Sequence, residues 1–198
     1  MKRVEDFFRD IDAHWGALAE PRVRLRIIGS AALLLQTDYQ RGTKDSDVLE
    51  TAELKGSTAA RLTELAGKGT HLSLRHRMYV DIVGSALPFM PQEPTWRRLD
   101  SLSQTLRHLE VEALDVTDVV VSKLKRFLPH DRADIVAMIE RDLVAHEALI
   151  ERFRSAVDSY LLDARAEDLP RYVNNLHRVE RDDFGVHETE IELPSWLE

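Results

Sequence analysis

One order of residues constrains this chain more than any other: an apolar run broken by glycine and serine, then a polar stretch, then two aspartates one residue apart. The apolar run covers residues 27–35 and contains Gly29-Ser30, and the aspartates are Asp45 and Asp47. A glycine after a short apolar segment is typical of a turn from a strand into a helix. If the aspartates lie on a strand, side-chain alternation places both on the same face. The order therefore predicts a Gly-Ser turn near a pair of carboxylates.

The residues on either side of the Gly-Ser turn have the patterns of a strand and a helix. Residues 22–28 alternate arginine with apolar side chains, which is the period of a half-exposed strand. Residues 31–36 are good helix formers, and Ser30 is a suitable N-cap for them. Backbone N–H groups at a helix start bind anions, and Gly29 would let a phosphate approach closely. Such turns also join strands to helices that bind no ligand, but the nearby aspartates favour a phosphate site.

A third carboxylate lies within a later apolar segment. Asp81 interrupts the run Met78–Val83, whose other residues predict a strand. A lone carboxylate among apolar side chains is costly unless it is paired, bound to a metal or placed on a solvated face. The solvated face of an antiparallel sheet would account for Asp81 alone. With Asp45 and Asp47 in the same chain, we favour a shared acidic site.

The remaining patterns predict a mixed first half and a helical second half. Apolar residues at helical spacing predict a helix from residue 3 to about 19, ending before Pro21. Pro88, Pro91 and Pro94 indicate a loop. Further strands are expected at residues 71–74 and within 105–114, helices at 57–66, 115–127, 131–143, 147–162 and 167–177, and an irregular tail that packs or docks from residue 178 onward.

Composition and charge limit the classes of protein to consider. A chain of 198 residues with 43% hydrophobic and 31% charged residues is typical of one globular domain with at most a small appendage. The net charge of -8 argues against a surface that binds nucleic acid as a whole, because such binding depends on basic groups. Local basic clusters are either candidates for such a contact or solvated charge: Arg22, Arg24 and Arg26; Arg75, His76 and Arg77; Lys123, Lys125 and Arg126.

Other features bear on redox chemistry and location. The sequence contains no cysteine, which excludes disulfides and thiolate metal sites. No apolar stretch approaches the roughly 20 residues that cross a bilayer, and the N-terminal residues lack the apolar core of a signal peptide. We therefore expect a cytoplasmic protein that does not contact membranes.

Three carboxylates and a phosphate-binding turn together describe a site for a divalent metal and a nucleoside triphosphate. Magnesium prefers oxygen ligands and is usually held by one or two carboxylates together with substrate phosphates. Two ions about 4 Å apart can hold the attacking and leaving oxygens of an in-line displacement. Asp45 and Asp47 would bind metal, and Asp81 would complete one site or accept the proton of the attacking hydroxyl.

This arrangement resembles the pattern of the DNA polymerase β-type nucleotidyltransferase superfamily. In that pattern an apolar residue, a glycine and a second glycine or serine precede Asp-x-Asp, and a third acidic residue follows on a strand. The matching residues here are Ile28-Gly29-Ser30, Asp45-Ser46-Asp47 and Asp81. The spacer is slightly long, and Ser46 replaces the usual apolar middle residue. The resemblance implies magnesium, or manganese in its place, as the cofactor.

A narrower resemblance, over residues 25 to 140, is to the AbiEii-like nucleotidyltransferases, which include toxins of type IV toxin–antitoxin and abortive-infection systems. Their Arg-x-Thr-x-Asp-x-Asp motif matches the segment from Arg41 to Asp47 residue for residue, and their helix pair matches residues 114–124 and 131–135.

This narrower resemblance implies further site residues. Lys123 would approach the nucleotide phosphates and take part in catalysis, and Asp134 would orient groups in the same cleft. The alternatives are a surface lysine and a helix-surface or capping acid. Arg41 and Thr43 would join Gly29 and Ser30 in binding the nucleotide, or would instead hold the acidic loop in place.

The sequence therefore predicts an α/β fold of the polymerase β type, with a small mixed sheet flanked by helices and a helical C-terminal part. Residues 1–112 would form the nucleotidyltransferase core, and residues 113–198 a helical part that closes the cleft. The expected reaction moves a nucleoside monophosphate from an NTP to a hydroxyl of RNA, such as a tRNA 3′ end, of a protein, or of a small molecule. Because a fold does not determine function, the alternative is a non-catalytic protein that binds a nucleotide or a partner in a toxin–antitoxin complex. A cognate antitoxin is an expected partner.

Overall fold

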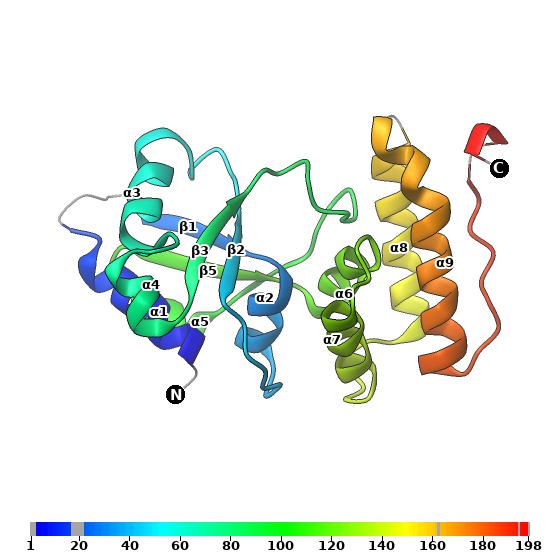
Figure 1. The fold of residues 1–198 in the computed structure, drawn as a ribbon, viewed down its shortest axis with the longest axis horizontal. Helices are drawn as coiled ribbons and strands as arrows, with labels where there is room; N and C mark the ends of the chain where they lie inside the picture. The colour runs from blue at the N-terminus through cyan, green and yellow to red at the C-terminus, as the bar shows by residue number, and fades with distance from the viewer. Residues whose placement is uncertain (1–2, 17–21, 162, 194, 198) are drawn as a thin grey trace. The chain divides into compact units, whose positions relative to one another are not determined.

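A computed structural model describes residues 3–16, 22–161, 163–193 and 195–197. The chain divides into two compact units. The first unit comprises Met1–Pro88 and Trp96–Leu114, and the second comprises Phe89–Thr95 and Asp115–Glu198. The first unit contains the sheet, whereas the second is built from helices (Figure 1).

The first unit is organised around a five-stranded mixed sheet. Its strands run in the order β3-β2-β1-β5-β4. The pairs β2/β3 and β1/β5 are parallel, and the pairs β1/β2 and β4/β5 are antiparallel. This sheet, flanked by helices, confirms the predicted α/β fold. The strands are β1 (Val23–Ile27), β2 (Asp45–Leu49), β3 (Tyr79–Val83), β4 (Trp96–Arg98) and β5 (Leu109–Leu114).

The two faces of the sheet differ because apolar and charged residues alternate along its strands. Leu25 and Ile27 of β1 and Val48 of β2 are fully buried, while Arg24 and Arg26 point to the opposite face. The apolar face carries the core of the unit, to which helix α1 adds Phe7 and other side chains at helical spacing. The helices of this unit are α1 (Arg3–His14), α2 (Gly29–Gln36), α3 (Gly56–Ala66), α4 (His71–His76) and the short α5 (Asp100–Ser103).

A buried carboxylate joins helix α1 to the start of strand β5. Asp12 is 5% exposed, and its side chain accepts hydrogen bonds from the backbone N–H groups of Arg107, His108 and Leu109 at 2.8 to 2.9 Å. These three donors precede or begin β5. The contact satisfies both the buried charge and the otherwise unpaired backbone groups.

The second unit is a set of helices with its own core. It contains α6 (Val116–Leu124), α7 (Pro129–Ile139), α8 (His146–Tyr160) and α9 (Leu169–Val179). A buried ion pair joins three of its segments: Asp118 of α6 accepts from Arg152 of α8 at 2.6 and 2.7 Å and from the backbone N–H of Thr95 at 2.7 Å. Among the helices that the structure describes, none has the length and apolar character needed to span a bilayer.

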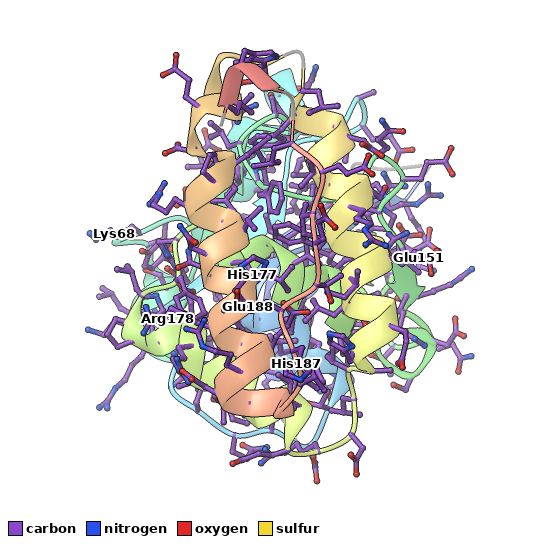
Figure 2. The ribbon with its side chains drawn as sticks, turned by 90° about the vertical axis from the view of Figure 1, so that its right-hand side faces the viewer. Lys68, Glu151, His177, Arg178, His187 and Glu188 are labelled. Atoms are coloured by element: carbon purple, nitrogen blue, oxygen red, sulfur yellow. The ribbon has the colours of Figure 1, made fainter. Side chains whose placement is uncertain are left out.

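The residues after α9 fold back along the helices of the second unit. A π-helical turn covers Glu180–Phe184, and an extended segment then runs beside α8 and α9 (Figure 2). Within this segment Thr189 donates its backbone N–H and its hydroxyl to the buried Glu180 carboxylate, and its carbonyl contacts His177. The expectation that the tail packs is therefore confirmed over residues 185–193, although regular structure continues past residue 178, to Phe184.

Two expectations about local structure are wrong. Residues 71–74 were expected as a strand, but α4 occupies His71–His76, because the Thr70 hydroxyl caps its start by accepting from the Ser73 N–H. Helix α2 begins at Gly29 rather than at residue 31, and its N-cap is Ile28, with no side-chain cap. Ser30 therefore lies in the first turn of α2 and is not its N-cap.

Other boundaries shift by a few residues. Strand β4 falls just after the proline loop, where no strand was expected. Helix α6 ends at Leu124, before the expected residue 127, and α7 starts at Pro129, which suits the first helical position, and ends at Ile139. Helix α1 is described to His14, and the expected continuation through residues 17–19 lies outside the described residues, as do Pro21 and the expected end of a helix at residue 162.

Candidate active site

The structure brings Asp45, Asp47 and Asp81 to the same face of the sheet. Asp45 and Asp47 lie on β2, on either side of Ser46, which is fully buried on the apolar face. Asp81 lies on the neighbouring parallel strand β3, and its Cα is the direct partner of the Cα of Asp47. Partnered residues of adjacent strands project to the same side, so the acids share the face opposite the core.

Gly29 lies directly against this acidic group. The residue before it, Ile28, donates its backbone N–H to the carbonyl of Asp47 at 2.9 Å, which holds the end of β1 beside β2. Gly29 has a φ of +63°, and a Cβ added to it would lie 2.9 Å from Oδ2 of Asp47. Only glycine combines this backbone conformation with so close an approach of a carboxylate. The structure thus places the Gly-Ser turn and the aspartate pair together.

Contacts of Arg41 and Thr43 attach the loop before β2 to the same site. Arg41 donates to the hydroxyl of Ser30 at 2.6 Å. The hydroxyl of Thr43 lies 3.0 Å from Oδ1 of Asp45, and the Arg3 guanidinium donates to the Thr43 carbonyl. These contacts hold the acidic loop, and they place the Arg41 side chain against Ser30 and the Thr43 side chain against Asp45.

Tyr79 is a residue of this face that the sequence patterns did not single out. It begins β3, its Cα is the partner of the Cα of Asp45, and Asp81 follows two residues later on the same face. Partial burial raises the pKa of the Tyr79 hydroxyl, and the negative charges of Asp45, Asp81 and Asp47 raise it further. The Tyr79 hydroxyl is therefore within the electrostatic influence of all three carboxylates.

The rest of this face carries cross-strand charge pairs. Arg26 of β1 lies 3.2 Å from Glu112 of β5, and its guanidinium stacks over Trp96 of β4 at 4.9 Å from the ring centroid. Arg24 lies between Glu110 and Glu112 at 3.8 and 3.5 Å. Two of the arginines proposed as a basic cluster are thus balanced by glutamates. The third, Arg22, donates to backbone carbonyls of Ser103 and Leu109.

Lys123 and Asp134 lie in the second unit, where they form a buried cluster. The Lys123 ammonium is 2.7 Å from Asp134 and 3.2 Å from Asp131, and all three side chains are at most 5% exposed. Lys123 is therefore a buried lysine of an ion-pair cluster and not a surface lysine. Arg126 completes the cluster by donating to both oxygens of Asp131.

The acidic face offers carboxylate oxygens that could bind magnesium, but it does not provide a complete set of protein ligands for the ion. Carboxylate oxygens are the ligands that magnesium prefers. Among the residues that the structure describes, no group of three or more His, Cys, Asp or Glu side chains is placed to hold a metal ion by itself. The donor set still fits an ion that is held by one or two of these carboxylates and completed by phosphate oxygens and water.

Comparison with known proteins agrees with this arrangement. A family model described as "Nucleotidyltransferase of unknown function (DUF6036)" matches residues 6–179, a range that includes all the acids above. No curated protein and no solved structure matches the chain. Because the match covers most of its length, the chain belongs to this family of nucleotidyltransferases, DUF6036.

Proposed function

We propose that this protein transfers a nucleoside monophosphate from an NTP to a hydroxyl group and releases pyrophosphate. The observation that carries the proposal is the pairing of Asp47 with Asp81 across β2 and β3, with Asp45 on the same face and Gly29 against Asp47. Family membership supports nucleotidyl transfer in general. Phosphoryl-type transfer depends mainly on positioning and charge neutralisation, which such a group of carboxylates would provide through bound cations.

Each residue of the acidic face would have a distinct role. Asp45 and Asp47 would hold magnesium, or manganese, whose charge would neutralise the phosphates and the leaving pyrophosphate. Asp81 would complete one metal site and accept the proton of the attacking hydroxyl. The absence of a side chain at Gly29 lets the Asp47 carboxylate lie against the start of α2. The backbone N–H groups there would bind the triphosphate.

The residues around this group would support binding. Thr43 would orient the Asp45 carboxylate through its hydrogen bond, and Arg41 would fix Ser30 or contact a phosphate directly. By the AbiEii-like resemblance, Lys123 would approach the nucleotide phosphates and Asp134 would orient groups around the nucleotide. Their ion pair is compatible with this role only if the nucleotide can compete with Asp134 for the lysine.

The acceptor and the biological setting are part of the proposal. The resemblance to the AbiEii-like nucleotidyltransferases, carried by the Arg-x-Thr-x-Asp-x-Asp motif, suggests as acceptor an RNA, such as a tRNA end, or a protein hydroxyl. The same resemblance suggests a cytoplasmic toxin or defence system with a cognate antitoxin. The second candidate is a protein that binds a nucleotide or a partner without turnover. The presence of Asp81 favours catalysis, because binding alone does not require a proton acceptor.

The proposal is tested by incubating the purified full-length chain with each α-labelled NTP, magnesium and total RNA. We expect label to move to RNA or to protein, and to be lost in the Asp45→Asn/Asp47→Asn double variant and in Asp81→Asn. Asp158→Asn is the matched control, because Asp158 is exposed on α8 in the second unit. Magnesium-dependent NTP binding without transfer would favour the binding protein, and absence of binding would refute the site.

A further inference from the structure

Lys68 is an exposed lysine in a tight turn between α3 and α4, in the sequence Gly67-Lys68-Gly69. The turn follows α3 closely: the backbone N–H of Gly67 donates to the carbonyl of Thr63 at 2.8 Å. A Cβ at Gly67 would lie only 2.5 Å from that carbonyl oxygen, so no other residue fits without a shift of the backbone. The position from which the Lys68 side chain starts is thus set by close packing (Lys68 is labelled in Figure 2).

The Lys68 side chain extends to Tyr79 at the edge of the sheet. Its ammonium nitrogen lies 6.0 Å from the centroid of the Tyr79 ring, which is the outer limit of a cation–π contact. Within the described part of the chain, Lys68 has no ion pair and no hydrogen bond to a side chain. An unpaired lysine in a protein of net charge -8 is notable, because carboxylates outnumber the cations available to them.

Tyr79 links Lys68 to the acidic face. Its Cα is the partner of the Cα of Asp45, and Asp81 lies two residues further along β3. The ring therefore lies on the same side of the sheet as the three acids. The ammonium of Lys68 lies 6.0 Å from the centroid of that ring, so it is a cation near the margin of the acidic face, and it has no ion pair with a carboxylate among the described residues.

We propose that Lys68 contacts the phosphates of the nucleotide bound at the acidic face, and that the Tyr79 ring holds the lysine in position. This inference rests on the proposed function. Lysine binds phosphate as a compact point charge, and an unpaired ammonium reaches a new anion without first breaking an ion pair. Lys123, by contrast, is buried between two carboxylates, and Arg26 and Arg24 are balanced by glutamates. Lys68 thus adds a positive charge to that of Arg41, which donates to Ser30 at the Gly-Ser turn.

A simpler role for Lys68 would be to screen the carboxylates from one another. The two roles predict different results when the charge is removed. If Lys68 only screens the acids, Lys68→Ala makes the face more negative, which tightens binding of magnesium and changes nucleotide binding only by a weak repulsion that salt screens. If Lys68 contacts phosphate, the same substitution weakens triphosphate binding even though magnesium binds more tightly.

The experiment measures binding of MgATP, MgADP and AMP to the full-length chain by calorimetry, together with magnesium alone. We expect Lys68→Ala to weaken MgATP binding about tenfold, the loss of one charge-assisted hydrogen bond, and to change AMP binding less than MgADP binding. Lys68→Arg should retain most of the affinity. Tyr79→Phe, which keeps the ring, should bind like the wild type, whereas Tyr79→Leu should resemble Lys68→Ala. Lys55→Ala is the matched control, because Lys55 is an exposed lysine just before α3.

The outcomes separate this inference from the function on which it rests. If Lys68→Ala binds MgATP as tightly as the wild type while Asp45→Asn/Asp47→Asn does not bind it, the role of Lys68 is refuted and the proposed function stands. An equal loss for AMP and MgATP would also refute a phosphate contact. If the wild-type chain binds no nucleotide with magnesium, both proposals fail.

Discussion

A Cβ on Gly29 would lie 2.9 Å from Oδ2 of Asp47, which is closer than a carbon and a carboxylate oxygen can approach. The glycine at the end of β1 and the second acid of β2 are therefore packed against each other, although they are separated by a polar loop in the sequence. The absence of a side chain at one residue sets the position of a carboxylate at the other. This relationship makes Gly29 part of the acidic site and not only a turn residue.

Substitution of Gly29 by alanine should disable the site. The φ of +63° costs alanine about 1 to 2 kcal/mol, and the new methyl group must displace the Asp47 carboxylate. We expect Gly29→Ala to lower the unfolding free energy by about that amount and to abolish magnesium-dependent nucleotide binding. Urea unfolding and calorimetry measure the two effects. Gly42→Ala is the control, because a Cβ at Gly42 meets nothing within 4 Å; wild-type binding by Gly29→Ala would contradict the expectation.

Ser46, on the apolar face of β2, should affect the stability of the fold. Its hydroxyl is fully buried and has no hydrogen-bond partner among the described residues. An unsatisfied buried donor costs stability, so Ser46→Ala should raise the unfolding free energy by about 1 kcal/mol. Ser103 is the matched comparison, because its equally buried hydroxyl bonds to the backbone of Val111, and Ser103→Ala should instead cost about 1 kcal/mol. Urea unfolding of the two variants should therefore shift the midpoint in opposite directions.

The sequence predicts the individual strands of this site better than the way in which the strands pair with one another. The alternation of residues 22–28 predicted β1, and the spacing of Asp45 and Asp47 predicted a shared face, because both depend only on the period of a strand. The pairing of Asp47 with Asp81 depends on β3 lying beside β2 in one register, across two intervening helices. No local pattern specifies that register.

Short elements and long-range contacts account for the remaining differences. Helix α4 has only six residues, and alternation in His71–Leu74 imitates a strand over so short a length. The contact of Lys68 with Tyr79 joins a turn to an edge strand, so neither residue has a motif of its own. The charge pairs between β1 and β5 are also long-range contacts. In the sequence alone Arg24 and Arg26 form a basic cluster, but in the folded chain they lie beside Glu110 and Glu112 of β5.

Thr43 should affect binding through Asp45. Its hydroxyl lies 3.0 Å from the Asp45 carboxylate, and its side chain is otherwise buried. Thr43→Val keeps the shape and removes the hydrogen bond, which should weaken MgATP binding about threefold to tenfold by releasing the carboxylate. Thr43→Ser should preserve the affinity. If valine and serine bind MgATP equally well, the hydroxyl does not orient Asp45.

The buried cluster around Asp131 predicts how stability depends on pH. Burial opposes ionisation of Asp131, but hydrogen bonds from Arg126 and the charge of Lys123 outweigh it and lower the pKa from 3.8 to about 2. A carboxylate whose pKa is lower in the folded state stabilises the fold above its unfolded pKa, and this stabilisation is lost as the pH falls towards the folded pKa.

The contribution of Asp131 should therefore be complete at pH 7, where the shift is worth about 2 kcal/mol, and should fall by about half at pH 3. Asp131→Asn lacks the titrating group, so it should be less stable than the wild type at pH 7, and the difference should narrow by about 1 kcal/mol at pH 3. Urea unfolding of both proteins at the two pH values gives this difference. Because the rest of the chain titrates in both proteins, its contribution cancels. A difference that stays constant with pH would mean that Asp131 has an ordinary pKa, and that Lys123 and Arg126 do not stabilise its charge.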